Sequence, residues 1–303
     1  MSIADAAGET DPRRQAVHED RRARRIGTIE RSRPHPANPR PDDGRQALNT
    51  NDRSKNEDRR DGRPAEPPTS RRLLAELVGT AALVFVAVGS DAMARLAHGE
   101  ISTAARAVAP GLMVGALIYA IGDVSGAHLN PAVTAAFTLK RLFPPALVLP
   151  YWVAQAAGAL LAAGVVGVLF GDAVEAGVST PHVVPAVAVS LEVILTLLLV
   201  LVILGTADRA RIVGPDAALA VAATISLCGL IALPIDGASM NPIRSLAPAI
   251  VAGRLGDTWI YIVGPLAGAV VAVVITIALH GTHDHDRKAE EAAQGKSESP
   301  GTS

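Results

Sequence analysis

The sequence is poor in cysteine and in aromatic residues, and it lacks the motifs of common enzymes. Its single cysteine, Cys228, excludes a disulfide within one chain, and aromatic residues make up 3% of its 303 residues. The chain between its two polar ends shows no metal-ligand spacing, no nucleotide-binding loop and no nucleophile beside a base. We therefore expect no enzyme, no cofactor and no resident metal. Three histidines lie near the C-terminus: His280, His283 and His285. We expect them to belong to a solvated tail rather than to bind a metal.

Basic residues are scarce beyond residue 72. Of the 28 lysines and arginines, 17 lie in residues 1–72 and 11 in the remaining 231 residues. The first 72 residues also carry 13 acidic side chains and almost no aromatic ones, a composition that cannot bury a core. We expect disordered tails over residues 1–72 and 282–303, and no nucleic-acid partner, because interspersed charges favour a solvated polyampholyte. No apolar run follows an Arg pair before Leu73, so no ordinary signal peptide is predicted.

Long apolar runs fill the chain between these tails. Six of them approach the roughly 20 residues that a helix needs to cross a bilayer. They cover residues 73–95, 105–123, 146–170, 184–205, 215–235 and 257–280. We expect one membrane domain over residues 73–281, with a first repeat at about 73–170 and a second at about 184–280.

The two halves of this domain repeat each other. Tyr151 and Gly158 in the third run recur as Tyr261 and Gly268 in the sixth, 110 positions later in both cases. Each half also holds three spans, and an odd number of spans forces the two repeats to cross the membrane in opposite directions.

Each half contains an Asn-Pro pair that predicts the start of a short helix. The two boxes are Asn130-Pro131-Ala132 and Asn241-Pro242-Ile243. Asn is a preferred N-cap and Pro a preferred first helical residue. The stretch from Pro131 to Lys140 would span about 15 Å, half of a hydrocarbon core about 30 Å thick; the stretch from Pro242 to Arg254 repeats the pattern. We expect two half-helices that enter from opposite sides and meet at their N-termini.

These motifs resemble the signature of the aquaporin or major intrinsic protein family. The first box of that family commonly lies in Ser-Gly-Ala-His-x-Asn-Pro-Ala-Val-Thr, which residues 125–134 match in full. The second box departs from the family, since Ile243 stands where Ala is usual, although the family's arginine follows as Arg244. The resemblance covers about residues 73–280. It implies an all-α membrane protein with six transmembrane helices, two re-entrant half-helices and an inverted repeat, assembled as a homotetramer with one pore per subunit.

The resemblance also assigns four positions to the narrowest ring of the pore. Counting from the two asparagines places them at Pro110, Gly229, Ala238 and Arg244. Water-selective members usually carry a bulky aromatic residue and a histidine at the first two positions, so this ring should be wide, with one charged donor and mostly apolar walls. That resembles the glycerol- and metalloid-conducting branches, whereas Ser245 after the arginine resembles water channels. The bulk of Ile243 could narrow or shift the pore.

Several polar residues stand inside this apolar domain. If the side-chain oxygens of Asn130 and Asn241 cap their helices, their NH2 groups stay free to donate to a solute oxygen. The two helix N-termini and the Arg244 guanidinium would repel a cation or a hydronium ion. Glu76 and Glu192 need partners at this depth. The matching glutamates of the family hold the re-entrant loops, and we favour that role over proton carriage.

The orientation follows from the basic residues that flank the spans. Eight of them would lie on the cytoplasmic side if both termini are cytoplasmic, against three on the other side. The eight are Arg71, Arg72, Lys140, Arg141, Arg209, Arg211, Arg287 and Lys288, and the three are Arg95, Arg106 and Arg254. This places both termini in the cytoplasm of a plasma-membrane protein. His128 would then either point into the cytoplasmic vestibule or be satisfied by backbone groups.

The sequence predicts a passive channel for water and small uncharged solutes, surrounded by membrane lipid. Two alternatives stay open. A proton-coupled secondary transporter also uses inverted repeats and broken helices, and Ile243 could mark a degenerate pore in a non-conducting scaffold.

Overall fold

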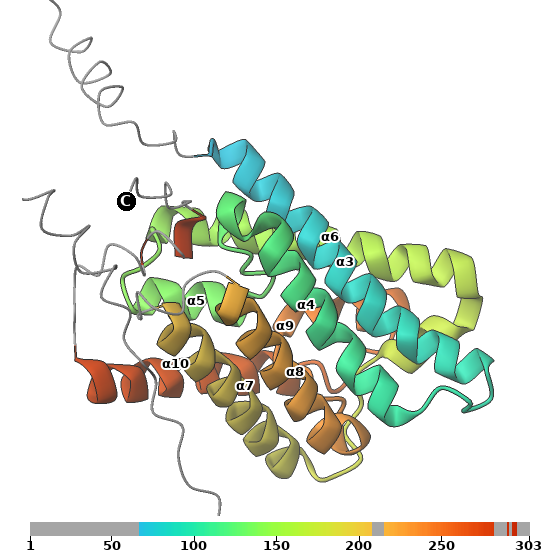
Figure 1. Cartoon of the computed structure of the whole chain (residues 1–303). Coiled ribbons are helices and arrows are strands. Elements are labelled where there is room, and N and C mark those ends of the chain that lie inside the picture. Colours follow the sequence, from blue (N-terminus) through green and yellow to red (C-terminus); the bar gives the residue numbers. More distant parts are fainter. Residues whose placement is uncertain (1–66, 208–214, 282–289, 291–292, 296–303) are drawn as a thin grey trace, which may run out of the picture. The chain divides into compact units, whose positions relative to one another are not determined.

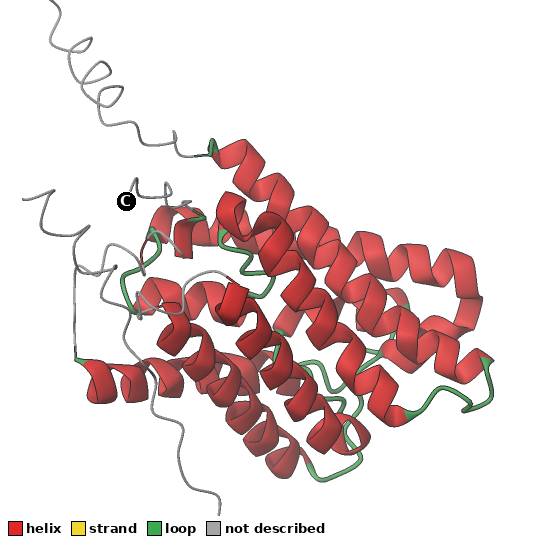
Figure 2. Cartoon of the chain, viewed as in Figure 1, coloured by secondary structure: helices red, strands yellow, loops and turns green. Residues whose placement is uncertain are grey.

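The computed structural model describes residues 67–207, 215–281, 290 and 293–295, and every regular element in these ranges is a helix (Figure 2). Six of these helices are long and apolar enough to cross a membrane. They are α3 (Thr69–Leu96), α4 (Thr103–Ser125), α6 (Val148–Phe170), α7 (Pro185–Ala207), α8 (Pro215–Asp236) and α10 (Ile260–His280) (Figure 1). The predicted all-α fold with six transmembrane helices is therefore confirmed.

Two shorter helices begin at the prolines of the Asn-Pro pairs. They are α5 (Pro131–Leu139) and α9 (Pro242–Val251), and the short 3-10 helices η2 (Pro145–Leu147) and η3 (Gly171–Gly177) flank α6. At 9 and 10 residues, α5 and α9 are about 15 Å long, about half of the bilayer core. Both are half-helices, as predicted, although α9 ends before Arg254.

The helix contacts repeat between the two halves of the domain. α3 packs on α6 and α4 as α7 packs on α10 and α8. α5 contacts α10, α6 and α7, and its counterpart α9 contacts α6, α10 and α3. α4 contacts its counterpart α8, and α5 contacts its counterpart α9. Exchanging the two halves therefore leaves this pattern of contacts unchanged, as expected for the inverted repeat.

Two equivalent glycines allow α6 to approach α3 closely and α10 to approach α7 closely. A Cβ atom at Gly158 of α6 would collide with the backbone oxygen of Leu77 in α3, and one at Gly268 of α10 would collide with that of Val193 in α7. Small residues at helix interfaces let backbones approach closely, and this close packing drives helix association in a membrane. The glycine repeat in the sequence thus marks two equivalent packing points.

The outer faces of the helices are apolar. Large side chains such as Leu112, Val168 and Leu227 are exposed, whereas the buried apolar side chains are mostly alanine, valine and leucine. Apolar surface of this extent needs lipid or another apolar subunit to cover it. Helix α3 begins at Thr69, earlier than the predicted boundary at residue 73. The expected disordered tails, residues 1–72 and 282–303, lie almost wholly outside the described residues.

Candidate pore

Asn130 and Asn241 cap the two half-helices. Asn130 Oδ1 accepts a hydrogen bond from the backbone N–H of Ala132 at 2.9 Å. Asn241 Oδ1 accepts from the N–H groups of Ile243 at 3.1 Å and Arg244 at 3.4 Å. Both asparagines have extended backbone conformations, as N-cap residues usually do. The positive ends of two helix dipoles therefore start at these two side chains.

The same two asparagines link the re-entrant loops to each other. Asn130 Nδ2 donates to the backbone oxygen of Met240 at 2.8 Å, and Asn241 Nδ2 donates to that of Leu129 at 2.9 Å. The expectation that both NH2 groups stay free needs amendment, because each gives one N–H to the opposite loop. An amide nitrogen carries two N–H groups, so each asparagine keeps a second donor. Both residues line the central cavity.

Equivalent loop residues adopt left-handed backbone conformations. Ala127 and Leu129 have φ of 46° and 54°, and Ala238 and Met240 have φ of 44° and 55°. A residue other than glycine pays about 1–3 kcal/mol for such a conformation, so surrounding contacts must hold it. The same positions are strained in both loops, so the left-handed conformation is a conserved feature of the two structural repeats.

The fully buried Glu76 supplies those contacts for the first loop. Its Oε1 accepts hydrogen bonds from the N–H of His128 at 2.9 Å and the hydroxyl of Ser125 at 2.7 Å. Its Oε2 accepts from the N–H of Leu129 and from Nε2 of Gln155, both at 2.8 Å. Each oxygen is used twice, so the carboxyl group holds the strained loop against α3 and α6.

Glu192 repeats this arrangement for the second loop. Its two oxygens accept from the N–H groups of Ser239 at 2.6 Å and Met240 at 2.8 Å. The repeated tyrosines also have matching roles, since the hydroxyl of Tyr151 donates to Ser125 O and that of Tyr261 donates to Asp236 O. These contacts agree with the scaffold role that the sequence favoured for the two glutamates.

A cavity of about 460 Å³ runs beside the linked loops. It is lined by all four predicted ring positions, Pro110, Gly229, Ala238 and Arg244, and by Asn130, Asn241 and His128. The ring of His128 is also satisfied, because Nδ1 lies 3.1 Å from Thr134 Oγ1 and Nε2 lies 2.9 Å from Ala293 O. His128 thus lines the cavity and also contacts one backbone oxygen.

Gly229 leaves less room in the pore than its missing side chain suggests. A Cβ atom there would lie 2.9 Å from Ala107 O and 3.2 Å from Ala107 Cα, on the neighbouring helix α4. The glycine therefore allows α8 to approach α4 closely. A larger residue would push the two helices apart, so Pro110 and Ala238 are better positions at which to change the width of the ring.

The third residues of the two boxes face away from the cavity. Ala132 is fully buried in an apolar cluster with Ala269 and Ala272 of α10. Ile243 is 7% exposed and belongs to a cluster with Val84 of α3 and Ala163 of α6. Neither residue lines the cavity. The expectation that Ile243 narrows or shifts the pore is therefore not supported, since its side chain fills a helix interface.

Replacing Ile243 by alanine should destabilise the protein without changing its permeability. Removing three buried carbons costs about 2–4 kcal/mol in the free energy of unfolding. Thermal unfolding in detergent measures this loss, and osmotic flux per reconstituted protein should equal that of the wild type. Ile250→Ala on the same helix is the control, because Ile250 is 45% exposed. A rise in flux per channel at unchanged stability would instead place Ile243 in the pore.

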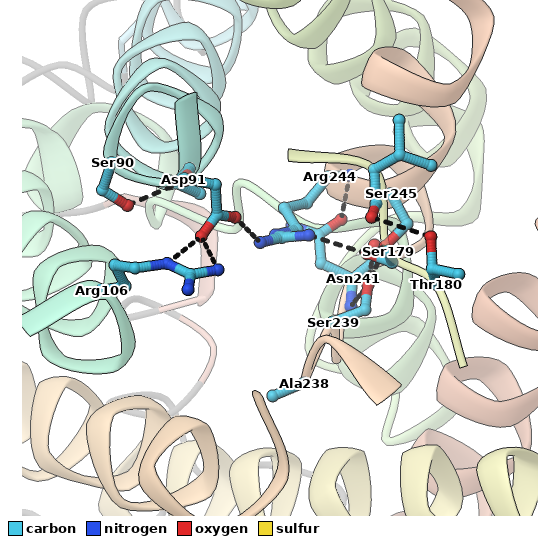
Figure 3. A network of polar contacts seen from close by, with 12 residues as sticks. Ser90, Asp91, Arg106, Ser179, Thr180, Ala238, Ser239, Asn241, Arg244 and Ser245 are labelled. Atoms are coloured by element: carbon cyan, nitrogen blue, oxygen red, sulfur yellow. Dashed lines mark hydrogen bonds and ion pairs between the residues drawn. The ribbon is translucent and has the colours of Figure 1, made fainter. Parts of the chain in front are cut away.

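Arg244 is held from two sides at one end of the cavity (Figure 3). Its Nη1 donates to Ser179 Oγ at 2.7 Å, and its Nη2 lies 3.5 Å from Asp91 Oδ2. Arg106 lines the same cavity outside the four predicted ring positions, and the sequence had not predicted it as a pore residue. Arg106 stands one helical turn before Pro110, and this spacing was the signal that could have identified it.

The comparison with known proteins agrees with this geometry. Residues 65–276 match the model of the major intrinsic protein family. Aquaporin NIP1-1 of Oryza sativa subsp. japonica is 45% identical over 207 residues, covering 67% of this chain and 72% of the relative. Nodulin-26 of Glycine max is 39% identical over 204 residues, covering 67% and 75%. The X-ray structure of the aquaglyceroporin from Plasmodium falciparum matches with a TM-score of 0.63 at 23% identity, over 69% of this chain and 95% of that one.

The chain belongs to the major intrinsic protein family, the aquaporins. The likeness to the Plasmodium structure supports the aquaporin fold. The protein is thus a multi-pass membrane channel, as the Asn-Pro boxes had predicted.

Proposed function

We propose that the protein conducts water and small uncharged solutes passively, including molecules of the size of glycerol. The observation that carries this proposal is the reciprocal bonding of Asn130 and Asn241 beside a cavity of about 460 Å³. A neutral solute finds N–H donors there and needs no full desolvation. A cation approaches two positive helix ends and the Arg244 guanidinium, so it meets an electrostatic barrier.

The chemistry of the ring suits hydroxylated molecules with an apolar side. Pro110 and Ala238 offer apolar wall, and Arg244 offers N–H donors on the same cavity. Glycerol and uncharged metalloid hydroxides combine these two kinds of surface. Because both buried glutamates are occupied by loop contacts, neither is left as the proton carrier that a proton-coupled transporter would need.

Replacing Pro110 by phenylalanine tests the width of the ring. Pro110 is half-buried within α4 and has no N–H, so its loss removes no backbone hydrogen bond. The added ring should lower glycerol permeability at least about tenfold, a barrier increase of about 1.4 kcal/mol, and water permeability less. Stopped-flow light scattering of proteoliposomes measures both rates.

Pro234→Phe is the matched control for this experiment. Pro234 lies inside α8 but is exposed and does not line the cavity, so its replacement should leave both permeabilities unchanged. An equal loss of glycerol and water permeability in Pro110→Phe, or no loss of either, would show that Pro110 does not set the solute size.

The cellular setting extends the proposal. The excess of basic residues, eight against three, supports a plasma-membrane protein with both termini in the cytoplasm. The Arg244 end of the pore then faces outward. The exposed apolar faces fit contact with lipid or with a neighbouring subunit, and the family resemblance implies a homotetramer with one pore per subunit. Native mass spectrometry from membranes would test the assembly.

A further inference from the structure

Three charged side chains from three helices meet at the Arg244 end of the pore (Figure 3). Asp91 of α3 accepts a hydrogen bond from Arg106 Nε of α4 at 2.7 Å, and Arg106 Nη2 lies 2.7 Å from the same oxygen, Oδ1. The other oxygen, Oδ2, lies 3.5 Å from Nη2 of Arg244 in α9. One carboxylate therefore bridges two guanidinium groups.

These three side chains are shielded from solvent to different degrees. The side chain of Asp91 is 5% exposed, that of Arg244 8% and that of Arg106 26%. A buried charge without a partner is expensive, and removing one member of a buried pair leaves such a charge behind. Asp91 reduces the charge of the two arginines from +2 to +1. It also separates two like charges that would otherwise repel each other.

The three residues differ in their access to a passing solute. Arg106 and Arg244 line the cavity of about 460 Å³, together with Pro110, whereas Asp91 lines only a second, more open cavity that it shares with Arg106. On a solute inside the first cavity, Asp91 therefore acts through the arginines. Since Ser179 Oγ binds Nη1 of Arg244 and Asp91 approaches Nη2, the Arg244 guanidinium is restrained at two nitrogens.

We propose that Asp91 is a positioning residue for selectivity and that Arg106 is a second specificity-determining donor. The inference rests on the proposed channel function. Asp91 keeps the Arg244 guanidinium at the cavity wall and orients the guanidinium of Arg106, which stands one helical turn before Pro110. A neutral solute with several acceptor oxygens then meets two sets of N–H donors in succession. Their combined charge stays low enough to prevent the pore from attracting anions.

Charge removal in single and double variants tests this inference. Asp91→Asn keeps the size of the side chain but leaves two arginines uncompensated, so their repulsion should move Arg244 into the lumen. The ratio of glycerol to water permeability should fall at least about tenfold, and chloride permeability should rise, because the charge becomes +2. The double variant Asp91→Asn with Arg106→Gln removes the repulsion, so it should recover part of the ratio.

This recovery is the readout that a merely structural role would not produce. Independent structural damage from two substitutions would add, whereas coupled charges give a non-additive result. The ratio of two permeabilities does not depend on how much protein is reconstituted. Arg95→Gln is the control: Arg95 lies in the same region, pairs with Glu175 at 3.6 Å, and both side chains are well exposed. Its ratio should equal that of the wild type.

The outcomes separate the inference from the proposed function. The inference is overturned if Asp91→Asn has the wild-type ratio of glycerol to water permeability. It is also overturned if the double variant has a lower ratio than Asp91→Asn alone. In both cases, flux through the wild-type protein would still support the channel function. If Asp91→Asn does not fold, the single variant Arg106→Gln tests the inference instead. The loss of one set of N–H donors should lower the ratio of glycerol to water permeability about threefold. An unchanged ratio in Arg106→Gln overturns the inference. If wild-type vesicles show no flux, both proposals fail.

Discussion

Replacing Glu76 by leucine should leave almost no folded protein in the membrane. The substitution removes the acceptor of four buried donors: Ser125 Oγ, His128 N, Leu129 N and Gln155 Nε2. Each unsatisfied donor costs about 1–3 kcal/mol, so the sum approaches the whole stability of a typical domain, about 5–15 kcal/mol. Size-exclusion chromatography of detergent extracts and thermal unfolding measure the loss.

Two further variants show whether the acceptor oxygens are the cause. Glu76→Gln keeps one oxygen and should give an intermediate stability. Glu175→Leu, at a 42% exposed side chain, should cost little. Wild-type yield and stability in Glu76→Leu would contradict the scaffold role of this carboxyl group.

Replacing Arg244 by methionine should let protons leak through the channel. The charge of the cluster with Asp91 and Arg106 falls from +1 to 0, and the guanidinium donors leave the cavity wall. A unit charge at about 4 Å is worth about 4 kcal/mol at an effective dielectric constant of 20. The helix ends retain part of the barrier, so we expect the proton leak to rise by more than about tenfold. The collapse of a pH gradient in dye-loaded vesicles measures it.

Arg254→Met is the matched control for this leak. It removes the same charge just beyond the end of α9, from an exposed side chain, and should leave the pH gradient as stable as in wild-type vesicles. A proton barrier that survives Arg244→Met would assign the exclusion of protons to the half-helix ends alone. The role that we give to the guanidinium would then be wrong.

The fold could be predicted because its signals are local and repeated. The Asn-Pro pairs encode both the cap and the first residue of each half-helix, and α5 and α9 do begin at Pro131 and Pro242. The stretches from Pro131 to Lys140 and from Pro242 to Arg254 predicted a length of about half a bilayer for each. The recurrence of Tyr151 and Gly158 as Tyr261 and Gly268 revealed the repeat, since equivalent packing points require the same small or hydrogen-bonding residue.

The candidate pore was less predictable because its contacts join distant segments. The link from Asn130 to Met240 spans 110 positions, and no spacing along the chain reveals which carbonyl a loop presents to its partner. Asp91, Arg106 and Arg244 come from three helices, and each could be read alone as an end-of-helix charge. The direction of a side chain on a half-helix also depends on how the helix is rotated. For this reason the bulk of Ile243 suggested a narrowed pore, whereas the side chain packs against α3 and α6.

The central claim is that two half-helices meet inside the membrane and line a conduit that passes neutral molecules but no protons. Wild-type proteoliposomes that contain a pH-sensitive dye test it in one sample, with protein-free vesicles as the reference. We predict volume changes under water and glycerol gradients that are faster than the reference, with a pH gradient that decays no faster than the reference. Volume changes at the reference rate, or a pH gradient that collapses together with water flow, would contradict the account.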